Sequence, residues 1–169
     1  VNIYGPYRVT RAFAPLIIES KGRISIIGSI AGTLSSATWG PYSMTKHAME
    51  AYADALKDEM SKFGVQVSLV EPGTYKSKIA DSALKRMEQR DQTRENSQFQ
   101  AEMTESVNWL AAFQDESGDP AEVAAVVMHA LFDDAPKSRY LIVPNQEQAH
   151  WTINRAMERL VEQKAASAP

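Results

Sequence analysis

The chain has 169 residues, of which 44% are hydrophobic and 23% charged, values typical of a single globular unit. A net charge of −3 offers no basic surface for nucleic acid, and no apolar run approaches the ~20 residues that a membrane span needs. The absence of cysteine excludes disulfides and thiolate metal sites, and the three histidines lack metal-ligand spacing. We expect a cytoplasmic protein without metal, nucleic acid or membrane span.

The first half of the chain alternates between helix and strand. The predicted order is helix 3–19, strand 23–28, helix 42–63 and strand 65–71. Pro15 is expected to kink or shorten the first helix, and Pro72 to end the second strand. The two strands flank a crossover of about forty residues, which is typical of a βαβ unit with parallel strands. The sequence therefore predicts the α/β class.

The second half changes character. Residues 80–100 are rich in charged side chains, which indicates a solvated helical face. The apolar side chains among and after them are expected to pack in a core: Met87, Phe99, Met103, Trp109 and Phe113. Asp119-Pro120-Ala121-Glu122 predicts a helix start, with Glu122 in a structural role. A strand at 139–143 and a helix at 146–163 follow, and the tail 164–169 is expected to fray.

Tyr42 and Lys46 stand four residues apart, so they should lie one turn from each other on the same helix face. A lysine charge roughly 4 Å from a phenol, at an effective dielectric of about 20, is worth about 4 kcal/mol. That energy corresponds to close to three pKa units, enough to make a tyrosine a general acid/base near pH 7. The same spacing also occurs in an ordinary amphipathic helix, whose stripe here holds Met49, Tyr52, Leu56 and Phe63.

Ser29 lies thirteen residues before Tyr42 and directly after the strand that Gly28 closes. The helix with Tyr42 begins near the same end of that strand, after Pro41. Ligands in open parallel α/β sheets bind at the carboxyl edge of the strands. The spacing therefore favours a functional serine over a simple turn hydroxyl.

This pattern resembles the short-chain dehydrogenase/reductase family. The resemblance covers residues 1–79 and continues more loosely to the end, and it is carried by Asn2, Ser29, Tyr42 and Lys46 with Gly5, Gly32 and Pro72-Gly73 around them. Gly28 stands where the family often has a second serine, and Ser77 stands at a threonine position. The fold implied is the C-terminal portion of a Rossmann-type doubly wound parallel sheet, with the N-terminal strands absent. It would form one truncated domain: a catalytic half at 1–79, a lid-like helical region at 80–115 and a closing helix–strand–helix at 119–163.

The family's opening strand and glycine-rich turn are not found in this sequence, which begins at Val1. We expect the chain to be the C-terminal part of a longer protein whose other half binds the adenosine and pyrophosphate. The isolated 169 residues are expected to be inactive, prone to aggregation and weak in dinucleotide binding, because the edge of strand 23–28 would be unpaired.

The resemblance also implies roles. Tyr42 would exchange the proton on the substrate oxygen, Lys46 would assist it and bind the nicotinamide ribose, Ser29 would orient the substrate, and Asn2 would fix a helix bend and a water. NAD or NADP would contact Tyr42, Lys46, Pro72, Gly73, Thr74, Tyr75 and Ser77. The substrate, a partly apolar alcohol or ketone, would contact Ser29, Trp39 and Tyr42. The full-length protein would be a homo-oligomer. Within the family, the chain also shows a weaker resemblance to the steroid- and retinol-dehydrogenase-like branch.

Two alternatives stay open. The parent protein could be a catalytically silent NAD(P)-binding regulatory protein, although the complete Ser-Tyr-Lys set argues against it. The chain by itself could also act only as an oligomerisation module, since the stripe at Met49, Tyr52 and Leu56 suits either a core or an interface.

Overall fold

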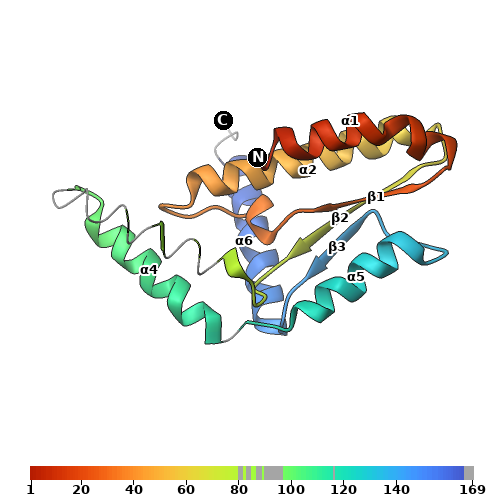
Figure 1. Cartoon of the computed structure of the whole chain (residues 1–169). Coiled ribbons are helices and arrows are strands. Elements are labelled where there is room, and N and C mark those ends of the chain that lie inside the picture. Colours follow the sequence, from red (N-terminus) through yellow and green to blue (C-terminus); the bar gives the residue numbers. More distant parts are fainter. Residues whose placement is uncertain (80–81, 83–84, 87–88, 90–96, 116, 166–169) are drawn as a thin grey trace.

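A computed structural model describes residues 1–79, 82, 85–86, 89, 97–115 and 117–165 (Figure 1). The elements in chain order are α1 (Tyr4–Glu19), β1 (Arg23–Ile27), η1 (Ile30–Gly32), α2 (Gly40–Ser61), β2 (Gln66–Pro72), α4 (Gln100–Asp115), α5 (Pro120–Phe132), β3 (Arg139–Ile142) and α6 (Gln146–Ala165). The predicted helices and strands in these ranges are confirmed, with bounds that differ by a few residues.

The described strands form one parallel sheet in the order β1-β2-β3. Ile26 of β1 pairs with Leu69 of β2, and Val70 of β2 pairs with Tyr140 of β3. The predicted parallel pairing and the α/β class are confirmed. Helices α1 and α2 lie on one side of the sheet and α5 on the other (Figure 1). Within the described residues, no strand pairs with the outer edge of β1.

The core lies between β2 and α2. Residues 67–71 of β2 are all buried, as expected of a central strand covered on both faces. Met49 and Leu56 of α2 pack there, in a cluster that consists of Ile26, Met49, Ala53, Leu56, Met60, Val65, Val67 and Leu69. The expected stripe is wrong at Phe63, because α2 ends at Ser61 and Phe63 lies 39% exposed in the turn before Gly64.

Helix α1 continues through Pro15 to Glu19, so the proline does not shorten it. The turn that follows uses the left-handed conformation at Lys21, where φ is 48°. Helix α1 has no fully buried residue. Ile17 and Ile18 pack against the core, while other apolar side chains face outward: Tyr4, Tyr7, Val9, Phe13 and Leu16.

The later helices depart from the predictions in part. Phe99 and Trp109 are 64% and 46% exposed, so the expected core packing is wrong for both. The reason is that α4 stands away from the sheet (Figure 1) and contacts the loop before α2, where Thr38 and Ser106 share a hydrogen bond. Met87 lies outside the described residues, as does the side chain of Phe113 and most of the charged run.

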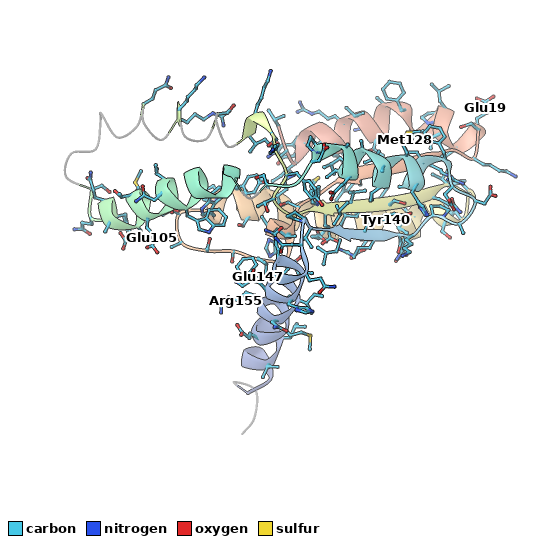
Figure 2. All side chains as sticks on the ribbon, turned by 90° about the horizontal axis from the view of Figure 1, so that it is seen from below. Glu19, Glu105, Met128, Tyr140, Glu147 and Arg155 are labelled. Carbon is cyan, nitrogen blue, oxygen red and sulfur yellow. The ribbon has the colours of Figure 1, made fainter. Side chains whose placement is uncertain are left out.

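Helix α6 extends away from the sheet, as the view from below shows with Glu147 near its start and Arg155 further along (Figure 2). It reaches Ala165, two residues beyond its predicted end, and residues 166–169 of the expected frayed tail lie outside the described part. Among the helices that the structure describes, none is long and apolar enough to cross a membrane.

Candidate active site

Helix α2 carries Tyr42 and Lys46. It begins at Gly40 with Pro41 in its first turn, a position where proline's missing N–H costs no hydrogen bond. The Lys46 ammonium lies 5.9 Å from the centre of the Tyr42 ring, so the two side chains share one face as predicted.

Lys46 reaches the end of strand β1. Its Nζ donates to the carbonyl oxygen of Gly28 at 2.9 Å and to that of Ile27 at 3.3 Å. Burial lowers the pKa of Lys46, and the negative charge of Glu50, one turn further along α2, partly offsets this effect. The ammonium is thus held between the helix and the strand end.

Ser29 follows β1 with an extended backbone, at φ −177° and ψ 159°. Its Oγ accepts from the backbone N–H of Ala31 at 3.2 Å and so caps the short helix η1. A hydroxyl that accepts one hydrogen bond can still donate its own proton to another partner. The Ser29 hydroxyl is therefore fixed in place at the end of β1.

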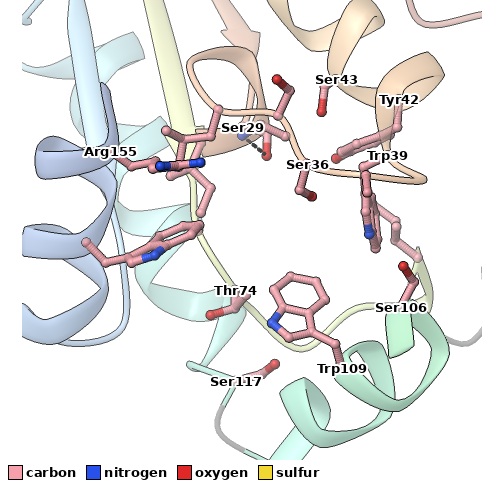
Figure 3. Close-up of a pocket in the computed structure, with 18 of the residues that line it drawn as sticks. Ser29, Ser36, Trp39, Tyr42, Ser43, Thr74, Ser106, Trp109, Ser117 and Arg155 are labelled. Atoms are coloured by element: carbon pink, nitrogen blue, oxygen red, sulfur yellow. Dashed lines mark hydrogen bonds between the residues drawn. The ribbon is translucent and has the colours of Figure 1, made fainter. Parts of the chain in front are cut away.

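Ser29 and Tyr42 line a common cavity of about 650 Å³ (Figure 3). Trp39 stands 5.7 Å from the Tyr42 ring and 5.7 Å from the Trp109 ring, centre to centre, in edge-on contacts. Trp151 of α6 also lines the cavity. The three tryptophans come from three separate parts of the chain and give the cavity a large aromatic surface.

Charged groups also line the cavity. Arg155 of α6 points into it (Figure 3), and among the described lining residues it is the only Lys or Arg. Its Nη1 also donates to Glu158 at 2.9 Å. Glu102 and Glu105 of α4 line the cavity as well. Sequence reasoning missed Trp151 and Arg155, because no motif links the final helix to the site.

The turn after β2 forms another wall. A Cβ on Gly73 would collide with Oε1 of Gln148 and lie 2.8 Å from Cγ1 of Val143, so a larger residue here would force these side chains to move. The Gln148 amide accepts from the Thr74 N–H at 3.0 Å and donates to the Thr74 hydroxyl at 2.7 Å. Helix α6 thus holds this turn in place, a contact that sequence reasoning did not foresee.

Tyr75 is held by a residue predicted to be structural. Its hydroxyl donates to Glu122 at 3.0 Å, while Asp119 caps α5 by accepting from the Ala121 N–H. Burial and the bond to the Glu122 carboxylate raise the pKa of Tyr75 to about 12. This contact agrees with the structural role expected for Glu122. Its side chain accepts from Tyr75, whereas Asp119 caps the start of α5.

The predicted site residues divide into those that line the cavity and those that do not. The cavity is lined by Ser29, Trp39, Tyr42, Gly73, Thr74, Tyr75 and Ser77, whereas Asn2, Lys46 and Pro72 are not among its lining residues. Asn2 donates to the Thr45 hydroxyl at 3.4 Å, which in turn donates to the Tyr42 carbonyl. Within the described part of the chain, no cluster of three His, Cys, Asp or Glu residues could hold a metal ion.

Known proteins have sequences similar to this chain. The family model of the short chain dehydrogenases matches residues 1–88. The bovine (Bos taurus) mitochondrial D-beta-hydroxybutyrate dehydrogenase is 36% identical over 154 residues, which cover 83% of this chain and 44% of that protein. The 3beta-hydroxysteroid dehydrogenase dhs-16 of Caenorhabditis elegans is 45% identical over 87 residues, or 52% of this chain and 22% of that protein.

Solved structures agree with the fold. A short-chain dehydrogenase from Streptomyces avermitilis superposes with a TM-score of 0.70 at 26% identity and covers 98% of this chain. A family member from Burkholderia phymatum, in complex with NAD, superposes with a TM-score of 0.72 at 23% identity. The chain covers 56% and 57% of these two structures, so it spans about half the length of the proteins that it matches. With its family match over more than half of its residues, the chain belongs to the short-chain dehydrogenase/reductase family.

Proposed function

We propose that the protein transfers a hydride between NAD(P) and an alcohol or ketone, with Tyr42 as general acid/base. One observation carries the proposal: Ser29, at the end of a strand, and Tyr42, on a helix, line the same cavity. Lys46 lies one helical turn from Tyr42. A positioned side chain that gives or takes a proton typically contributes about 10²- to 10⁴-fold to a rate.

Each side chain has a role that its contacts support. Tyr42 exchanges the proton on the substrate oxygen, and Ser29, whose hydroxyl still has a proton to donate, orients that oxygen. Lys46 provides a positive charge behind Tyr42. Its ammonium, which is not among the lining residues of the cavity, is further proposed to bind the ribose of the cofactor. Asn2 helps to position Tyr42 through Thr45. The Asn2 amide donates to the Thr45 hydroxyl, and that hydroxyl donates to the Tyr42 carbonyl.

The turn from Gly73 to Ser77 fits the nicotinamide end of NAD or NADP. Its glycine and hydroxyl residues line the cavity together with Ser29 and Tyr42, and Gln148 fixes its backbone from α6. When bound, the cofactor would supply or accept the hydride, and the chain's residues supply position and charge. Relatives of similar fold have been solved with NAD and with NADP, which supports a nicotinamide cofactor without choosing between the two.

The cavity favours a substrate with an apolar body. Trp39, Trp109 and Trp151 provide aromatic surface, as they would for a steroid of the kind named in the nematode relative. Arg155 adds one positive charge, which suits the carboxylate of a hydroxy acid such as the hydroxybutyrate named in the bovine relative. Glu102 and Glu105 line the same cavity from α4, whereas Arg155 belongs to α6. We therefore infer a partly apolar hydroxy acid whose carboxylate lies at Arg155, away from α4.

The experiment uses the full-length protein with NAD or NADP and a panel of hydroxy acids, steroids and simple secondary alcohols, followed by the absorbance of the reduced cofactor. Tyr42→Phe is expected to lose hydride transfer by orders of magnitude and to keep nucleotide binding. Equal activity of wild type and Tyr42→Phe would refute the role of Tyr42. Cofactor binding without turnover of any panel member would favour the regulatory alternative.

A homo-oligomer is the second part of the proposal. Helix α1 presents largely exposed apolar side chains on its outer side: Tyr4, Val9, Phe13 and Leu16. Size-exclusion chromatography with light scattering of the full-length protein tests this, and a monomer at all concentrations would refute it. An oligomer that has no cofactor binding would support the assembly-module alternative.

A further inference from the structure

An ionic cluster lies behind the cavity and joins three elements. Arg139 of β3 donates through Nη1 to Glu71 of β2 at 3.0 Å and to Glu50 of α2, and through Nη2 to both carboxylate oxygens of Asp54 at 3.2 and 3.3 Å. The side chains of Glu71 and Glu50 are only 5% and 16% exposed. One positive and three negative groups give a formal charge of −2 (1 − 3), so Arg139 neutralises only part of the cluster.

Glu50 extends the face of α2 that carries Tyr42 and Lys46. The three residues follow one another at intervals of four, so each stands about one turn from the next. The negative charge of Glu50 raises the pKa of Lys46 and opposes the larger effect of burial. Whatever changes the charge or place of Glu50 therefore changes the electrostatics at Lys46.

Glu50 also supports the backbone on both sides of Ser29. A Cβ on Gly32 would lie 2.4 Å from Glu50 Oε1, and a Cβ on Gly28 would lie 3.3 Å from the same atom. This oxygen is buried and has no hydrogen-bond partner within the described part of the chain. Because Oε1 has no bond of its own, the position of the carboxylate depends on the bond between its other oxygen and Arg139.

Few other charges can act on Lys46. Tyr42 and Glu50 belong to its own helix, and residues 24–40, which include the end of β1 and the Ser29 loop, contain no charged residue. That loop offers Lys46 only the carbonyls of Ile27 and Gly28. Arg139 of β3 and Glu71 of β2 are connected to this face of α2 by ion pairs: Arg139 contacts both Glu50 and Glu71.

We propose that Arg139, anchored on Glu71, is a positioning residue that holds Glu50 beneath the Ser29 loop and draws its charge away from Lys46. Without the guanidinium, two mostly buried carboxylates would face each other uncompensated, a costly arrangement. Glu50 would then turn toward its remaining cation, Lys46. The ammonium would leave the strand end, and the loop with Ser29 would lose its support.

The experiment measures Lys46 itself as well as catalysis. The Nζ signal of Lys46, assigned by its loss in Lys46→Arg, is titrated by NMR in the full-length protein with Arg139→Met or Glu50→Gln. Relative to wild type, the pKa of Lys46 is expected to rise in Arg139→Met, since a positive charge is lost and Glu50 is freed, and to fall in Glu50→Gln, since its charge is gone. Arg139→Lys keeps the positive charge, so a rise in that variant reports the release of Glu50. Asp58→Asn removes a charge from the exposed side of the same helix and serves as the control.

The kinetic arm rests on the proposed function. Arg139→Met is expected to lower kcat on the order of ten- to a hundredfold, as misplacement of a reacting group does, and to raise KM for the cofactor as well, because the displaced Lys46 is also the proposed ribose contact. Arg139→Lys, which keeps the charge but loses the two-sided contact, should recover part of the loss. Should Arg139→Met not fold, Arg139→Lys gives the same test with a smaller rise in the pKa of Lys46.

The outcomes separate the two ideas. Shifts of the Lys46 pKa in the same direction in both variants, or shifts no larger than in Asp58→Asn, overturn the positioning role. Opposite shifts without any hydride transfer by the wild type support the cluster's control of Lys46 and refute the proposed function. Opposite shifts together with the loss of kcat support both.

Discussion

The Nζ of Lys46 lies 2.9 Å from the carbonyl oxygen of Gly28, the residue that precedes Ser29. The same ammonium stands 5.9 Å from the centre of the Tyr42 ring. One side chain therefore connects the helix that carries the tyrosine with the strand end from which the serine emerges. This double contact makes Lys46 the geometric link of the candidate active site.

Replacing Lys46 by methionine should abolish most of the activity. The variant loses the positive charge beside Tyr42 and the donor that fixes the end of β1. We expect kcat to fall by about 10²- to 10⁴-fold, the usual contribution of an acid/base group and its support. Lys57→Met changes a partly exposed lysine of the same helix and should keep wild-type kinetics. Unchanged kcat in Lys46→Met would contradict the site.

Substitution of Gly73 by alanine should destabilise the turn after β2. The added Cβ would lie 2.0 Å from Oε1 of Gln148, and such overpacking typically costs about 1–3 kcal/mol of unfolding free energy. Gln148→Ala removes the nearest obstructing atoms and leaves Val143 Cγ1 at 2.8 Å, so the double variant should lose less than the sum of the single variants. Urea denaturation measures all three. Gly5→Ala, where nothing lies within 4 Å of the new Cβ, is the matched control.

Tyr75 should make stability depend on pH in the alkaline range. Burial and the bond to Glu122 raise its pKa to about 12 in the folded protein, above the ordinary value of a tyrosine. The unfolded chain releases this proton first, so the contribution is complete below the ordinary pKa and is lost as pH rises towards 12. Tyr75→Phe should show a smaller alkaline loss of unfolding free energy. Identical slopes in wild type and variant would rule out this coupling.

Arg155 should select for a negative group on the substrate. Arg155→Met is expected to raise KM for a hydroxy acid by roughly tenfold, the equivalent of ~1.4 kcal/mol, and to leave KM for a neutral alcohol of similar size nearly unchanged. Arg155→Lys keeps the charge and should lie between the two. Steady-state kinetics of the full-length protein provide the measurement. An equal rise for both substrates would mean that Arg155 shapes the cavity instead of recognising charge.

Local signals in the sequence determined the elements and the family. Apolar runs predicted the strands, the crossover of about forty residues predicted the parallel pairing of the first two, and Asp119 with Pro120 predicted the start of α5. The Ser29, Tyr42 and Lys46 spacing pointed to one site because strand ends and helix starts meet at one edge of a parallel sheet. The predictions of the helices and strands are confirmed because each depends on residues close in sequence, where periodicity and turn chemistry act directly.

Only the tertiary structure decided which distant side chains complete the site. Gln148 reaches Thr74 across 74 positions, and Arg139 reaches Glu50 across 89. No periodicity encodes such pairs, because they depend on how α6 and β3 pack against the turn after β2 and against α2. The same reason explains the exposure of Trp109: its helix packs against the loop before α2 and not against the sheet. The sequence by itself therefore predicted the candidate site residues Ser29, Tyr42 and Lys46, whereas their supports and the cavity walls follow from packing between elements far apart in the chain.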